Sequence, residues 1–79
     1  MNNQEKLVNC FTSALGISPG LVTDTLGYNN IAQWDSVAHM ALVTELESAF
    51  DVMLDTDEIL AMSTVFIARE MLAKRGIEF

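Results

Sequence analysis

Apolar side chains recur three and four positions apart through most of this 79-residue chain, and this spacing limits its fold most narrowly. Such spacing places apolar residues on one face of an α-helix, whereas a half-buried strand alternates at every second residue. The pattern predicts long helices at about residues 4–15, 36–50 and 64–74, with a short helical turn at 56–60. The apolar run at 50–54 is too short for a strand and has no partner, so we expect an all-α fold.

Residues typical of helix ends flank these segments. Gly16 follows the first helix where a left-handed residue commonly ends one. Asp35 is a good N-cap, so Ser36 becomes the first residue of the second helix. Lys74 suits the negative end of the last helix, and Gly76 stops it. The sequence therefore predicts a single domain over residues 1–79, a bundle of three long helices and one short helix.

A long connection, residues 17–34, separates the first two predicted helices. So long a segment in a small domain is normally functional or held down by its own side chains. Ser18-Pro19-Gly20 predicts one short helical turn within it. Apolar and aromatic anchors are spaced along the rest: Val22, Leu26, Tyr28, Ile31 and Trp34. We therefore expect an ordered loop.

The charge is strongly acidic, with eleven acidic and four basic residues and a formal net charge of −7. This balance argues against nucleic acid and anionic membranes, which bind cationic surfaces, and favours basic protein partners. No apolar stretch is long enough for a membrane span, and the first six residues lack the apolar core of a signal peptide. With Cys10 as the one cysteine, we expect a monomeric cytoplasmic protein without disulfides.

Metal binding and hydrolytic catalysis are also disfavoured. One cysteine and one histidine cannot assemble a soft-metal site, and the acidic residues lack the spacing of a calcium loop. Ser36 and His39 invite a hydrolase interpretation, but on the helical wheel we expect their side chains to be separated. Nothing nearby supplies an orienting acid or an oxyanion hole. We expect His39 to pack near the short third helix and Cys10 to fill the core.

The second predicted helix has an unusual outward face. Its core side carries His39 and several apolar residues, of which Leu46 is central. The opposite side is also partly apolar just past the helix start, at Val37, Met40 and Ala41, with acidic flanks. Such a strip is typical of a docking surface, although single exposed apolar residues are common on any protein.

Asp35-Ser36-Val37 opens that helix. A phosphodiester on a serine in the first helical turn is favoured by free N–H groups and by the helix dipole, although Asp-Ser pairs are also ordinary caps. The tripeptide follows one helix and a long loop, and its helix ends in Leu46-Glu47-Ser48-Ala49-Phe50-Asp51, before an acidic short helix. This arrangement resembles the acyl carrier protein family, whose signature is Asp-Ser-Leu at the start of the second helix.

The resemblance covers essentially the whole chain and implies that Ser36 carries a covalent 4′-phosphopantetheine arm. In that family a phosphopantetheinyl transferase adds the arm from coenzyme A with Mg²⁺, and Asp35 would help the transferase and its metal recognise the site. The arm then holds acyl groups as thioesters for acyl-loading and acyl-transfer enzymes, as in fatty acid or polyketide biosynthesis. The carrier itself catalyses nothing.

The form Trp34-Asp35-Ser36-x-x-His39-Met40 is similar to discrete carriers of specialised pathways. Val37 replaces the usual leucine, and Ala38 and Ala41 stand where fatty-acid carriers typically have polar or acidic residues. The resemblance and the outward face together predict these partner-binding residues: Val37, Met40, Ala41, Thr44, Glu45, Glu47, Asp57 and Glu58.

Two alternatives remain open. An aminoacyl or peptidyl carrier, loaded by an adenylation enzyme, would use the same thioester chemistry. An unmodified helical adaptor would use the apolar strip without any prosthetic group, and Ser36 would then stay unmodified. His39 lies where the family's cargo cavity is lined, so a minor part in cargo selectivity is a further possibility.

Overall fold

The computed structural model describes residues 2–79, and over these residues the chain is all-α, as predicted. Its helices are α1 (Asn3–Leu15), α2 (Ser36–Phe50), α3 (Thr56–Ala61) and α4 (Val65–Lys74). The predicted helical turn in the long loop is a 3₁₀ turn, Pro19–Leu21. No strand occurs in the part of the chain described, apart from one isolated β-bridge. Each helix lies within two residues of its predicted bounds.

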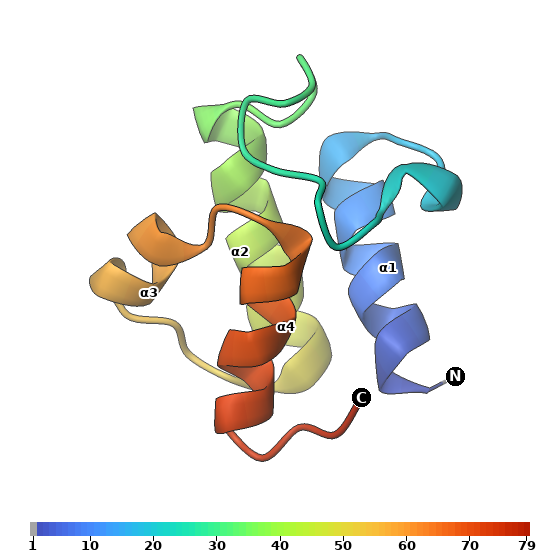
Figure 1. Ribbon diagram of the computed structural model, residues 1–79. Coiled ribbons are helices and arrows are strands. Elements are labelled where there is room, and N and C mark those ends of the chain that lie inside the picture. The colour runs from blue at the N-terminus through green and yellow to red at the C-terminus, as the bar shows by residue number, and fades with distance from the viewer. Residues whose placement is uncertain (1) are drawn as a thin grey trace.

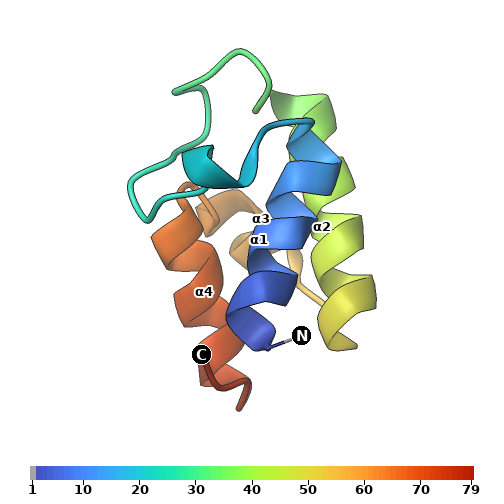
Figure 2. The same ribbon diagram turned by 90° about the vertical axis from the view of Figure 1, so that its right-hand side faces the viewer.

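The three long helices lie side by side, and α1 packs against α2 (Figure 1). The short α3 lies on the side of α2 and α4 away from α1, as the two views together show (Figures 1 and 2). The long loop crosses the end of the bundle at which α2 begins, whereas the start of α1 and the last residues of the chain lie at the opposite end (Figures 1 and 2). Over residues 2–79, no helix is long and apolar enough to cross a bilayer.

Short polar side chains cap the helix starts. The carboxylate or amide oxygens of Asn2, Asp35 and Asp55 each accept a backbone N–H in the first turn that follows, and the Thr64 hydroxyl does so for α4. These caps satisfy donors that a helix start leaves without partners. At the other end of α1, Gly16 adopts the left-handed conformation expected of it, with φ of 66°.

Asp51 ends α2 in the same left-handed conformation, with φ of 53°, although it has a side chain. Its carboxylate also lies at the negative end of the helix dipole. Asp51→Gly should therefore raise the free energy of unfolding by about 1 kcal/mol, measured by urea denaturation. Asp51→Asn, which removes only the charge, should give a smaller gain. A loss of stability in the glycine variant would contradict the strain inferred at this position.

The core lies between α1, α2 and α4 and is closed at one end by the loop. The largest of its almost fully buried side chains are those of Leu7, Phe11, Trp34, Leu42, Leu46, Met62, Val65 and Leu72. Phe50 and Ile67, which fit the apolar spacing of α2 and α4, are only partly buried. Phe50 is the last residue of α2, where it packs against the core and also contacts Phe79 and the Lys6 ammonium.

The long loop is tied to the start of α4. Tyr28 N–H donates to Ser63 O at 2.8 Å, Val65 N–H donates to Leu26 O at 3.0 Å, and Gly27 forms the β-bridge with Thr64. The backbones approach so closely that a Cβ on Gly27 would lie 3.1 Å from Ser63 O. Two of the predicted anchors, Leu26 and Trp34, are buried. The loop therefore has a defined path that ends at the start of α2.

A salt bridge adds to this connection. Arg69 Nη1 of α4 lies 2.7 Å from Asp24 Oδ1 of the loop. The hydrogen bond from the Arg69 guanidinium is the main cause that holds the pKa of the Asp24 carboxyl below its usual range. The loop backbone is held at the same point, because Phe66 N–H donates to Asp24 O.

Candidate functional site

Ser36 is the first residue of α2 and is exposed. The preceding Asp35 is extended, and its Oδ1 accepts Ala38 N–H at 2.9 Å. Among the described residues, the Ser36 hydroxyl has no hydrogen-bond partner, and the N–H groups of Ser36 and Val37 have no backbone partner. Asp35 thus fixes the helix start and leaves both a free hydroxyl and free donors at its tip.

A cavity of about 460 Å³ borders this serine, open on one side between α2, α3 and the loop. Most of its lining is apolar, and the lining residues are Tyr28, Ser36, His39, Met40, Ile59, Leu60, Met62 and Ser63. The sequence did not predict the contribution of Leu60 or Ser63, because a six-residue helix is too short to show which of its faces packs inward.

Ser36 and His39 border the same cavity, but the hydrogen bonds of the His39 ring go to other residues. Residues three positions apart are neighbours on a helix surface. The expectation that His39 packs near α3 is confirmed, because its Nε2 lies 2.8 Å from Ile59 O. Its Nδ1 lies 3.0 Å from Nε1 of Trp34, so both ring nitrogens are engaged.

Aromatic rings surround this pair. Trp34, which is fully buried, makes an edge contact with Phe11 of α1 at 5.3 Å between ring centroids and stacks near His39 at 6.1 Å. Tyr28 makes an edge contact with His39 at 5.4 Å. The N-terminal turn of α2 is therefore packed on its inner side against the loop, whose Trp34 in turn contacts α1.

The outward side of this turn is apolar and exposed, as the helical spacing predicted. Val37 is 79% exposed and Met40 is 52% exposed, and Ala41 and Thr44 are exposed further along α2. Leu60 of α3 is 77% exposed and lines the same cavity as Met40, so the apolar surface continues from α2 onto α3.

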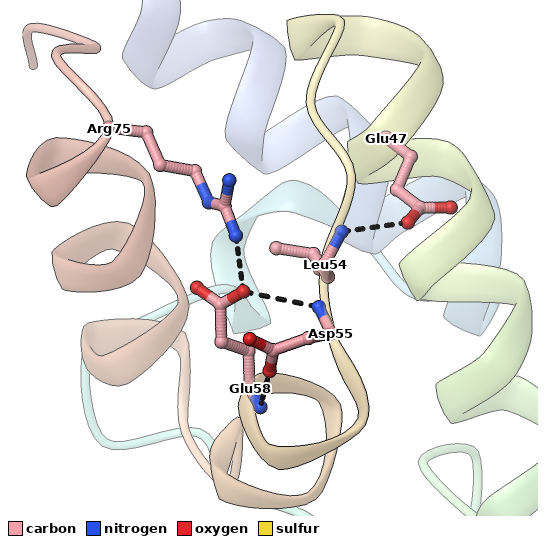
Figure 3. Close-up of polar contacts among 5 residues, drawn as sticks. All are labelled: Glu47, Leu54, Asp55, Glu58 and Arg75. Atoms are coloured by element: carbon pink, nitrogen blue, oxygen red, sulfur yellow. Dashed lines mark hydrogen bonds and ion pairs between the residues drawn. The ribbon is translucent and has the colours of Figure 1, made fainter.

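Three of the four carboxylates predicted to contact partners also make contacts within the fold. Glu45 Oε1 accepts the Ser13 hydroxyl at 3.1 Å, and Glu47 Oε2 accepts Leu54 N–H at 2.9 Å (Figure 3). Glu58 completes a capping box with Asp55 and pairs with Arg75 (Figure 3). The fourth, Asp57, is exposed. The Asp55-x-x-Glu58 spacing is a sequence signal of the capping box.

Cys10 is a core residue, as predicted, and its Sγ lies 3.6 Å from Glu45 O. Burial raises the pKa of its thiol from 9.0 to about 11, and the Glu45 carboxylate adds to the rise while Lys6 opposes it. The folded protein therefore favours the neutral thiol over the thiolate.

The raised pKa makes stability depend on alkaline pH. The thiol ionises near 9.0 in the unfolded chain and near 11 in the folded one. The contribution of the protonated thiol to the free energy of unfolding should be complete below pH 9.0 and lost as the pH rises through about 11. Urea denaturation from neutral to alkaline pH should show that the free energy of unfolding falls more steeply in the wild type than in Cys10→Ala. Equal losses in the two proteins would contradict this role of Cys10.

Across residues 2–79 no group of three histidine, cysteine, aspartate or glutamate side chains is placed to hold a metal ion. Comparison of the chain with protein-family models, with curated proteins and with solved structures gives no match. A function therefore has to be inferred from the structure itself. Its most distinctive feature is the free Ser36 hydroxyl at a capped helix start, beside an apolar cavity.

Proposed function

We propose that this chain is an acyl carrier protein, which holds acyl groups as thioesters on a 4′-phosphopantetheine arm attached to Ser36 and presents them to partner enzymes. The observation that carries the proposal is the exposed Ser36 hydroxyl, without a partner among the described residues, at the first position of α2 and on the border of the apolar cavity. The order of helices and the position of Asp35-Ser36 within them support the same function.

The start of α2 fits the phosphodiester that such an arm requires. The N–H groups of Ser36 and Val37 have no backbone partner, and the positive end of the helix dipole favours a negative group at this position. Asp35 keeps these donors together by capping the helix. When attached, the arm would supply a terminal thiol that holds the cargo as a thioester.

Particular residues of the chain take part in attachment of the arm and in contact with partner enzymes. Ser36 supplies the hydroxyl oxygen that becomes esterified, in exchange for the adenosine bisphosphate part of coenzyme A, and loses its proton in that step. The transferase and its Mg²⁺ are expected to approach from the side of Asp35, the residue adjacent to the hydroxyl. Val37 and Met40 remain exposed beside it for contact with the enzymes that load and unload the cargo.

The environment of His39 argues against the hydrolase alternative. A general base for Ser36 needs a free ring nitrogen within reach of the hydroxyl. Nδ1 and Nε2 of His39 instead contact Trp34 and the backbone carbonyl of Ile59. The free hydroxyl of Ser36 is therefore better explained as an attachment point for another enzyme to modify.

The cavity favours acyl over aminoacyl cargo. Met40, Ile59, Leu60 and Met62 present hydrocarbon and thioether surface to it. An alkyl chain gains free energy when such surface is removed from water, whereas the ammonium group of an aminoacyl thioester would lose hydration. An aminoacyl or peptidyl carrier would have to keep its cargo outside this cavity.

The direct test is incubation of the purified protein with coenzyme A, Mg²⁺ and a phosphopantetheinyl transferase of broad specificity, followed by intact mass spectrometry. The protein should gain the mass of one phosphopantetheine, and peptide mapping should place it on Ser36. No gain in mass, with a known carrier modified in the same tube, would favour the unmodified adaptor instead.

Partner enzymes should recognise the exposed apolar surface next to Ser36. Val37→Asp and Met40→Glu each place a charge in that surface, and each should slow acyl transfer by about tenfold or more if the residue is central to the interface. Ser48→Asp, on an exposed position far along α2, is the matched control and should have little effect. All three should be compared as phosphopantetheinylated proteins in a transfer assay.

The two outcomes of this assay have different meanings. Unimpaired transfer by both Val37→Asp and Met40→Glu would show that docking occurs elsewhere, with the long loop and α3 as the next surfaces to test. Weakened partner binding by the same variants, with or without the arm, would favour an adaptor.

A further inference from the structure

Few polar contacts hold α3 in place. None of its side chains is fully buried, and Leu60 is largely exposed. Near its start, Glu58 pairs with Arg75 of the α4 end, and the preceding Leu54 N–H donates to Glu47 (Figure 3). In the last turn of α3, among the described residues, the one polar contact to another element is that of His39 with Ile59 O, and the next tie follows two residues beyond the helix, where Ser63 O accepts Tyr28 N–H. The His39 contact joins α3 to the helix that carries Ser36.

The direction of the hydrogen bonds through His39 follows from the groups involved. The indole Nε1 of Trp34 is a donor only, so His39 Nδ1 must accept from it. The ring proton of the neutral imidazole is then on Nε2, which donates to Ile59 O. Ile59 O lies in the last turn of α3, where helix carbonyls lack partners within the helix. His39 thus supplies a donor that the end of α3 needs.

The cavity beside Ser36 depends on this same contact. Ile59 and Leu60 of α3, and Met62 directly after it, form one wall, and His39 and Met40 of α2 form the facing wall. A bond between the two walls sets the distance between them. Trp34 fixes the orientation of the imidazole because it is fully buried and packed against Phe11.

From this geometry we infer that His39 is a positioning residue, which holds α3 against α2 through Ile59 O and thereby sets the width of the apolar cavity beside Ser36. Release of this one bond lets the end of α3 move outward and widens the cavity. The link to cargo rests on the proposed function: an acyl chain on Ser36 too long for the closed cavity would require this movement.

Three substitutions of His39 separate its two hydrogen bonds. A glutamine amide reaches as far from the backbone as Nε2 and can donate to Ile59 O. An asparagine amide reaches only as far as Nδ1, so it can accept from Trp34 but cannot contact Ile59. Phenylalanine keeps a ring and makes neither bond. His39→Gln should therefore retain the contact with α3, and His39→Asn and His39→Phe should lose it.

Amide hydrogen exchange of residues 59–62, measured by NMR on the unmodified protein, reports opening of this end of α3. His39→Asn and His39→Phe should speed this exchange by about tenfold, the effect of losing one hydrogen bond, while the exchange of α1 amides stays unchanged. In His39→Gln the same amides should exchange at a rate within about twofold of the wild-type rate, because the glutamine amide keeps the hydrogen bond to Ile59 O. Trp34 is the only tryptophan, so its indole N–H signal shows directly whether its bond persists in each variant.

Unchanged exchange of residues 59–62 in both His39→Asn and His39→Phe would overturn the inference. So would faster exchange in His39→Gln equal to that in His39→Phe, because the effect would then come from lost packing. Nile red, an uncharged apolar dye, should bind the asparagine variant more tightly than the glutamine variant if the cavity widens, and equal binding would count against the widening. Because these measurements use the unmodified protein, their failure is distinct from a failure of Ser36 to accept the arm.

Discussion

Trp34→Ala should remove a large part of the free energy of unfolding of this domain. The indole is fully buried, contacts Phe11 and Tyr28, and donates to His39. Its removal leaves a large cavity, for which substitutions of this kind cost about 3–5 kcal/mol. A domain of this length has a free energy of unfolding of only about 4–12 kcal/mol.

The measurement is urea denaturation followed by far-ultraviolet circular dichroism, because the variant has lost the only tryptophan. Trp34→Phe is the matched control: it keeps an aromatic ring in the core but removes the donor to His39, and it should lose less stability than the alanine variant. A loss of under about 1 kcal/mol in Trp34→Ala would mean that the loop is not packed into the core as described.

Ser36→Ala should abolish modification by the phosphopantetheinyl transferase while leaving the fold intact. Without the hydroxyl there is no oxygen for the phosphodiester, so the rate should fall to zero. Stability should change by no more than about 0.5 kcal/mol, because the exposed Ser36 makes no hydrogen bond with the described residues and Asp35 provides the cap.

Ser63→Ala is the matched control for this prediction. Ser63 is also exposed and borders the same cavity, but it lies between α3 and α4 and precedes the N-cap of α4. It should be modified at the wild-type rate at Ser36. Transfer of phosphopantetheine onto the Ser36→Ala protein would contradict the assignment of the attachment site.

The helical fold was predictable because its determinants are local. The spacing of Leu7 and Phe11 in α1, and of Leu42 and Leu46 in α2, is visible in the sequence, and all four side chains are buried. The helix starts were predictable in the same way, because an N-cap contacts a backbone group only three residues ahead. Phe50 fits the same apolar spacing, yet it is only partly buried, at the last position of α2.

The candidate site was predictable only in its local part. Asp35 and Ser36 are adjacent in sequence, and their roles at the helix start follow from that. The cavity wall depends on α3, whose position is decided by contacts over long sequence separations, such as His39 with Ile59 and Arg75 with Glu58. Neither residue type nor spacing specifies these pairs, so the bond that joins α2 to α3 could be identified only in three dimensions.

The roles of two carboxylates in the fold were likewise not predictable from the sequence. Glu45 and Glu47 follow the apolar strip of α2 in sequence, which favoured an interpretation as partner contacts. In the fold they bond to Ser13 and to the backbone of Leu54. Their contribution to partner binding therefore has to be measured against the stability that their replacement removes.

The most direct measurement for the carrier function is the intact mass of the protein purified from the cells that naturally make it, without thiol treatment that would release a thioester. The carrier proposal predicts a mass higher than that of the bare chain by one phosphopantetheine, with or without an acyl group, located on Ser36. A second sample treated with hydroxylamine should lose the acyl mass and keep the arm. A protein recovered only at the mass of the bare chain, from cells in which another carrier is fully modified, would contradict the proposed function.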